Sequence, residues 1–160
     1  MREKIFKIII LVILFAWMIT IFCFSNQAST VSKKNSGRVI QNIIDVIPKT
    51  KNLDKKQKDK IVEKMQPIVR KSAHFFIYTM GGAILIITMT IVVKSNKNKE
   101  VIAFLIGASY AITDEVHQIF ISGRSMEFRD ILIDSTGVLI GITFGIIALK
   151  AIKNTIKIKK

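Results

Sequence analysis

One stretch of the chain, residues 111–134, places ionisable side chains inside apolar sequence typical of membrane helices. A histidine flanked by carboxylates is an arrangement for general acid and base chemistry. Ionisable side chains at membrane depth are costly unless they face protein or water, so they are functional candidates. The candidates in this stretch are Asp114, Glu115, His117, Gln118, Arg124, Asp130 and Asp134.

A second polar group precedes it. Arg70, His74 and Tyr78 are four residues apart and therefore share one helix face, with Lys71 beside them. Arginine suits bidentate contact with a phosphate or carboxylate. The predicted binding residues are Arg70, Lys71, Tyr78, Gln118, Arg124, Asp130, Gln27 and Asp134. His74 and His117 are the only histidines available for proton transfer.

Three other uses of these residues remain open. A divalent metal could take His74, His117, Asp114 and Asp134 as ligands, but no H-E-x-x-H signature is present, and we expect no metal or other cofactor. Serines such as Ser25 could be nucleophiles, although no nucleophile-elbow pattern surrounds them. Alternatively, the polar groups only fix the packing of a small helix bundle.

The composition indicates an integral membrane protein. The chain has 160 residues, a length that suits a single domain over 1–160, and half of them are apolar. The net charge is +14, with Lys and Arg at the ends of apolar runs, which favours membrane lipids over nucleic acid as partners. The single cysteine, Cys23, excludes a disulfide framework.

Four apolar runs predict an all-α, polytopic bundle of four transmembrane helices. The expected spans are residues 5–24, 72–93, 101–121 and 131–149. The first is too long for a signal peptide, so we expect a retained helix. Gly137, Gly141 and Gly145 recur every four residues and predict a helix-packing face.

Residues 25–71 form a long polar connection. Apolar residues at helical spacing over 39–47 and again over 53–66 predict two amphipathic helices on the membrane surface, the first ended by Pro48. A solvated linker is the alternative.

Antiparallel threading of four spans brings the polar groups into one layer at one membrane surface. The basic N-terminal tail, the loop 94–100 and the basic C-terminal tail then share the other side, which predicts cytoplasmic termini and an extracytoplasmic pocket. The basic residues of 25–71 argue for the opposite orientation.

The motifs resemble the VanZ-like family. The resemblance rests on Tyr110-x-x-x-Asp114-Glu115-x-His117-Gln118, then Gly123-Arg124 and Asp130, together with Arg70-Lys71-x-x-His74-Phe75-x-x-Tyr78 and Ser25-x-Gln27. The chain departs from the family where Ser122 replaces a frequent Pro and Asp134 replaces a frequent Asn.

The resemblance implies a small bacterial envelope protein linked to teicoplanin resistance, with no agreed activity. We expect it to bind or modify an anionic amphiphile, such as a lipid headgroup, a lipid-linked envelope precursor or a lipoglycopeptide. If it is an enzyme, His117 and His74 exchange protons, Asp114 and Glu115 orient them, and Arg70 and Arg124 hold the anion. A non-catalytic binder and a proton-coupled transporter are the rivals.

Overall fold

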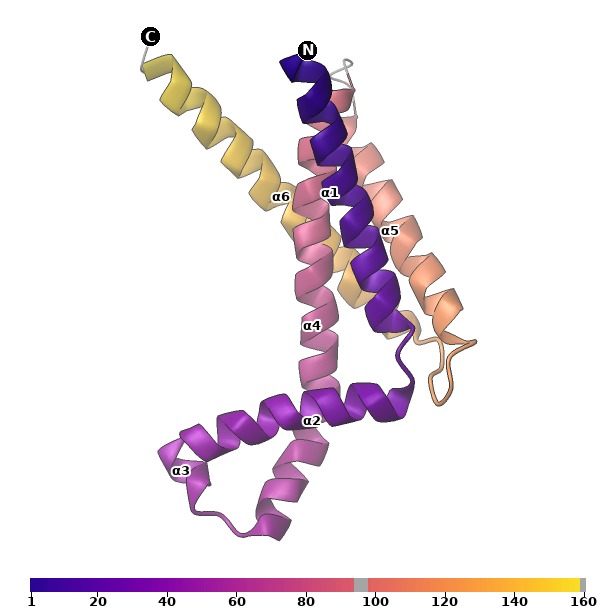
Figure 1. The fold of residues 1–160 in the computed structure, drawn as a ribbon, viewed down its shortest axis with the longest axis vertical. Helices are drawn as coiled ribbons and strands as arrows, with labels where there is room; N and C mark the ends of the chain where they lie inside the picture. Colours follow the sequence, from indigo (N-terminus) through magenta and orange to yellow (C-terminus); the bar gives the residue numbers. More distant parts are fainter. Residues whose placement is uncertain (94–97, 159–160) are drawn as a thin grey trace.

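The computed structural model describes residues 1–93 and 98–158, and these residues form helices joined by short connections. Figure 1 shows α1, α4, α5 and α6 packed side by side, with α2 crossing one end of the bundle and both termini at the other end. The all-α prediction is confirmed. The helices are α1 (Arg2–Ser25), α2 (Ser29–Val46), α3 (Pro48–Lys51), α4 (Lys55–Val92), α5 (Lys99–Gln118) and α6 (Phe128–Ile158).

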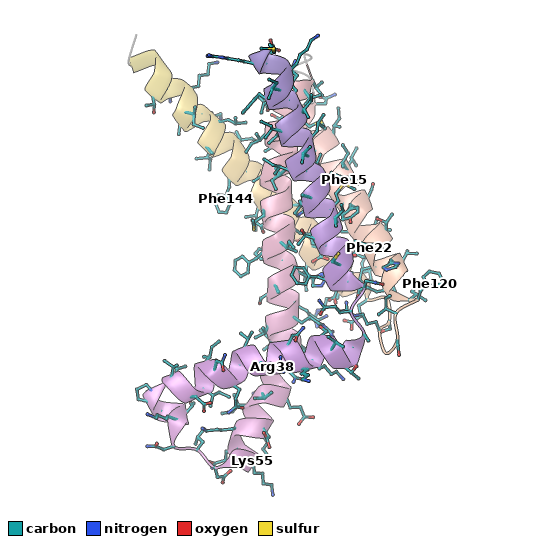
Figure 2. All side chains as sticks on the ribbon, in the orientation of Figure 1. Phe15, Phe22, Arg38, Lys55, Phe120 and Phe144 are labelled. Atoms are coloured by element: carbon teal, nitrogen blue, oxygen red, sulfur yellow. The ribbon has the colours of Figure 1, made fainter. Side chains whose placement is uncertain are left out.

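Within residues 1–93 and 98–158, three helices are long and apolar enough to cross a membrane: α1, α4 and α6. Helix α5 has 20 residues and lies against the same bundle, but its polar C-terminal third lowers its mean hydropathy. Large apolar side chains such as Phe15, Phe22 and Phe144 are exposed on the outer surface (Figure 2), as expected for helices surrounded by lipid. The chain is a multi-pass membrane protein.

Helix α4 corrects the predicted start of the second span. We expected a separate surface helix over 53–66 and a span from residue 72, whereas one helix of 38 residues runs from Lys55 to Val92. It starts at a capping box, in which Asp54 accepts from the Gln57 amide (2.7 Å) and Gln57 accepts from the Asp54 amide (3.2 Å). Pro67 lies inside the helix, and Figure 1 shows the segment before it tilted relative to the span.

Helix α2 is longer than predicted but amphipathic as expected. Ile40 and Ile44 are buried, whereas Val39 and Ile43 are exposed. Pro48 separates α2 from the single turn α3, because proline favours the first position of a helix. A 2.8 Å ion pair between Lys58 and Asp45 joins α4 to the far end of α2.

The glycine stripe on α6 packs directly against α4, as predicted. A Cβ atom on Gly141 would lie 1.9 Å from the Thr79 carbonyl oxygen, and one on Gly137 would lie 2.7 Å from the Phe75 carbonyl oxygen. The backbones therefore touch where only glycine fits. The helix continues past the predicted end at 149 to Ile158, because Lys and Ala in the basic tail are good helix formers.

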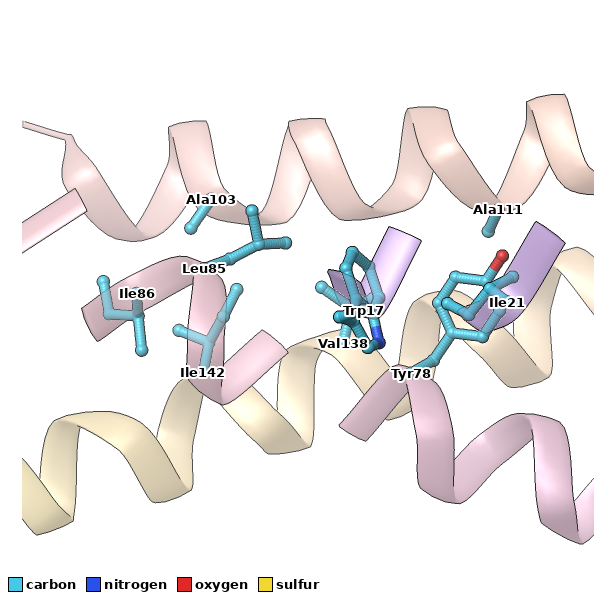
Figure 3. Packing of buried hydrophobic residues seen from close by; sticks show 9 residues of the cluster. All are labelled: Trp17, Ile21, Tyr78, Leu85, Ile86, Ala103, Ala111, Val138 and Ile142. Carbon is cyan, nitrogen blue, oxygen red and sulfur yellow. The ribbon is translucent and has the colours of Figure 1, made fainter. Parts of the chain in front are cut away.

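The apolar core lies between the four long helices (Figure 3). Trp17 is 6% exposed and donates its indole N–H to the Ile77 carbonyl at 2.9 Å. Tyr78 packs edge-on against Trp17. The predicted helix 101–121 ends at Gln118, where the chain turns through Gly123 (φ 73°) towards α6. Within the predicted basic loop 94–100, residues 94–97 lie outside the described part, as do residues 159–160 of the predicted tail.

Candidate functional site

Asp114 lies at the centre of a buried polar cluster at the end of the bundle opposite the termini. Its carboxylate accepts a 2.8 Å hydrogen bond from the Ser25 hydroxyl and a 3.4 Å hydrogen bond from the Gln118 amide. Asp114 and Ser25 are 5% and 0% exposed. The end of α1 is thereby tied to the end of α5, two segments that antiparallel threading places at one surface.

Glu115 anchors the loop that follows α5. One carboxylate oxygen accepts from the Gln118 side chain (2.9 Å) and the other accepts from the backbone amide of Glu127 (3.0 Å). Gln118 in turn accepts from the Arg124 guanidinium at 3.0 Å, and Arg124 also reaches the Phe24 carbonyl at 3.5 Å. This network holds Arg124 over the cluster.

Two helices meet at His74 and Asp134. The imidazole Nδ1 atom of His74, on α4, lies 3.6 Å from Oδ2 of Asp134, on α6. Asp134 is completely buried, and neither of its oxygens has a hydrogen-bond partner among the described residues. The hydroxyl of the buried Tyr78 also lacks a partner there. This part of the cluster is polar but incompletely satisfied, which calls for an explanation.

Lys71 lies at the outer edge of the cluster. Its ammonium group contacts Glu127 at 2.7 Å and forms a second ion pair with Asp130. The hydrogen bond from Lys71 holds the pKa of the Glu127 carboxyl below its usual value. Lys71, predicted as a binding residue, is therefore paired with two carboxylates in this structure.

A pocket of about 300 Å³ opens beside the cluster, under α2. Arg70, His74 and Arg124 contribute its charged or titratable wall. Burial is the main cause that lowers the pKa of Arg124, and the positive charge of Arg70 lowers it further. The two guanidinium groups therefore repel each other. Arg70 makes no hydrogen bond or ion pair with any described residue. The remaining lining residues are Ile21, Phe24, Gln27, Ser32, Asn35, Ser36, Val39, Val69, Ala73 and Ile77.

The structure does not bring all of the predicted site residues together. His117 is turned towards α1, where its ring lies 4.8 Å from that of Phe22, and its Nε2 atom has no hydrogen-bond partner among the described residues. Gln27 lines the pocket rim and accepts a 3.3 Å hydrogen bond from Asn35. The partner of His74 is Asp134, which had been assigned to binding.

Sequence reasoning missed two contributors. Ser25 was considered as a nucleophile, but it donates to Asp114. Glu127, in the loop before α6, supplies both a carboxylate for Lys71 and a backbone amide for Glu115. Ser25 lies at the polar end of the first apolar run and in the Ser25-x-Gln27 motif, but neither signal gave Asp114 as its partner. No signal distinguished Glu127 from other loop carboxylates.

The fold and the site define a class: a multi-pass membrane protein with a buried cluster of acidic groups, a histidine and arginines at one end of its helix bundle. The sequence model of the VanZ/LLP1 family matches residues 10–149, and the chain belongs to that family. The predicted resemblance is confirmed. Neither a search of curated proteins nor a search of solved structures returned a match.

Proposed function

We propose that the protein crosses a bacterial cell membrane four times, through α1, α4, α5 and α6. Support for α5 as a span comes from its length and its place beside the other three helices. The polar residues that lower its hydropathy face the cluster, so they are removed from lipid. The basic chain ends favour cytoplasmic termini, which puts the pocket at the extracytoplasmic face.

At this face the protein binds an anionic amphiphile. The observation that carries this proposal is the pocket, which joins two guanidinium groups, Arg70 and Arg124, to apolar walls from α1, α2 and α4. Guanidinium groups favour phosphate or carboxylate, and the apolar walls favour a hydrocarbon chain. A lipid headgroup with the start of its acyl chain, or a lipid-linked envelope precursor, has both parts.

Chemistry on the bound molecule would use His74. It is the one histidine that lines the pocket, and its Nδ1 atom lies 3.6 Å from the Asp134 carboxylate. A histidine backed by a carboxylate can take a proton from water or from a hydroxyl and return it to a leaving group. Arg70 and Arg124 would stabilise the charge that develops on the anion.

Binding is tested with the full chain in nanodiscs of phosphatidylcholine containing increasing phosphatidylglycerol, measured by native mass spectrometry. Arg124→Gln and Arg70→Gln should each weaken the preference for the anionic lipid by about tenfold, the effect of losing one charged hydrogen bond. Arg38→Gln is the matched control, because Arg38 is exposed on α2 and does not line the pocket. Equal binding of both lipids by the wild-type protein would refute the proposal.

Turnover separates an enzyme from a non-catalytic binder. Purified protein is incubated with phosphatidylglycerol or a lipid-linked precursor, and products are followed by mass spectrometry. Product that disappears in His74→Ala, with lipid binding retained, supports the enzyme. Binding without product supports a binder.

In cells, this binding would contribute to glycopeptide resistance. Only the family membership of the chain supports this part of the proposal. Cells that produce the wild-type protein should tolerate more teicoplanin than cells that produce Arg124→Gln at equal membrane abundance. If both kinds of cells were equally susceptible to teicoplanin, the pocket would have no part in resistance.

A further inference from the structure

His74, Asp114 and Asp134 come from three different helices, yet their ligand-type atoms all lie within 4.8 Å of one another. In a coordination shell with bonds of about 2.0–2.2 Å, neighbouring donor atoms are roughly 3.0–3.5 Å apart. Small rotations of the side chains would close the remaining gap. We propose that these three residues bind a divalent transition-metal ion, such as Zn²⁺ or Mn²⁺.

The charge around Asp134 supports a cation. Two buried carboxylates, Asp114 and Asp134, lie close together, and buried like charges are unfavourable unless something neutralises them. Two neighbouring donors bond to other carboxylates, since Gln118 donates to Asp114 and Glu115, while Lys71 donates to Glu127 and Asp130. Asp134 is left with His74 at 3.6 Å and no hydrogen bond among the described residues.

The buried hydroxyl of Tyr78 is a second, independent observation. It lacks a hydrogen-bond partner among the described residues, and the negative charges of Asp114 and Asp134 both act on it. The hydroxyl donates to neither of these carboxylates. With a metal bound, Tyr78 would donate to a ligating carboxylate oxygen or to a metal-bound water, as residues around metal sites commonly do.

There is also space beside these ligands. A crevice of about 10 Å³, bordered by His74, Asp134 and Gln118, continues the wall that carries Arg70 and Arg124. This volume is about that of one water molecule. Three protein ligands with a remaining position are typical of catalytic rather than structural metal sites. One imidazole with two carboxylates suits first-row divalent ions.

The donor set is narrower than the one the sequence suggested. His117 had been grouped with the other three residues as a ligand, but its ring stacks on Phe22 and it is not part of the group. This provides a matched histidine control. A metal-bound His74 could not also take a proton as the general base proposed above, so the metal site replaces that role of His74 and leaves the proposed lipid binding unchanged. Metal content can be measured without any added lipid.

The test uses the full chain purified with a tag that contains no histidine, in a Cys23→Ser background to remove the exposed thiol. After chelator treatment, Zn²⁺ or Mn²⁺ is added and bound metal is measured by equilibrium dialysis and elemental mass spectrometry. We expect one ion per chain in the parent protein and at least about tenfold weaker binding in His74→Ala and Asp134→Asn. His117→Ala and Asp130→Asn should keep the parent affinity.

Asp134→Asn keeps the shape of the side chain, so its loss of metal is interpretable if the protein elutes as the parent does. Co²⁺ provides a second readout, because its visible spectrum should change when His74 is replaced. The proposal is overturned if the parent protein binds no ion, or if His117→Ala loses metal as completely as His74→Ala. Failure of lipid binding with metal binding intact would refute the proposed function alone.

Discussion

The Nδ1 atom of His74 lies 3.6 Å from Oδ2 of Asp134, although the two residues belong to different helices, α4 and α6. This contact is longer than a good hydrogen bond, and the Asp134 side chain is completely buried. It places a titratable pair between the pocket under α2 and the carboxylates of α5. The predictions below test the surroundings of this pair.

Replacing Ser25 with Ala should destabilise the protein. The Ser25 hydroxyl donates to the buried Asp114 carboxylate at 2.8 Å, and loss of a hydrogen bond to a charged group costs about 1.5–3 kcal/mol. Thermal unfolding in detergent measures the change. Ser36→Ala is the control, because the Ser36 hydroxyl bonds only to carbonyls of its own helix. Equal melting temperatures for both variants would contradict the prediction.

Gly141→Ala should separate α4 from α6. The added Cβ would lie 1.9 Å from the Thr79 carbonyl oxygen, a backbone atom that cannot rotate away. Overpacking of this kind costs about 1–3 kcal/mol or more. The fraction of folded, monodisperse protein after solubilisation measures it. In the control, Gly37→Ala, the Cβ meets only flexible side chains, so this variant should behave as the parent does.

Glu127→Gln should reduce stability at neutral pH but not in acid. Because Lys71 depresses the pKa of Glu127 below 4.5 in the folded protein, the carboxylate contributes stability above that pH. The contribution is lost as the pH falls through the folded pKa. The pair is partly exposed, so we expect a melting difference of about 1–3 °C at pH 7. A melting difference that did not shrink as the pH was lowered into the acid range would argue against the ion pair.

Membrane orientation can be tested by labelling single cysteines in the Cys23→Ser background. Ser125 is exposed in the loop beside the cluster, and Glu100 is exposed at the other end of α5. An impermeant maleimide added to intact cells should label Ser125→Cys and not Glu100→Cys. The reverse pattern would place the pocket in the cytoplasm.

The helices could be predicted from the sequence because long apolar runs and the glycine repeat of α6 are local signals. The continuity of α4 could not, because Pro67 and the dense lysines before Ser72 resemble a helix boundary, whereas the capping box at Asp54 starts the helix much earlier. Periodicity also could not fix the end of α6, since its basic tail has strong helix propensity.

The antiparallel order of the helices predicted that the polar residues lie in one layer. It did not predict which side chains in that layer contact each other. Threading gives the depth of a residue, whereas partner choice depends on the rotation of each helix about its axis. Thus Asp134, and not Asp114 or Glu115, lies against His74, and His117 points towards Phe22. Whether the predicted residues act as a site remains a prediction.

The backbone contact between α4 and α6 has a consequence for the geometry of the cluster. Gly137 packs on the carbonyl of Phe75, so the residues next to His74 and one turn from Asp134 are held at the smallest separation two helices allow. No side chain intervenes there that could adjust by changing rotamer. The glycine stripe therefore acts as a fixed spacer, and the width of the opening between His74 and Asp134 is set by the main chain.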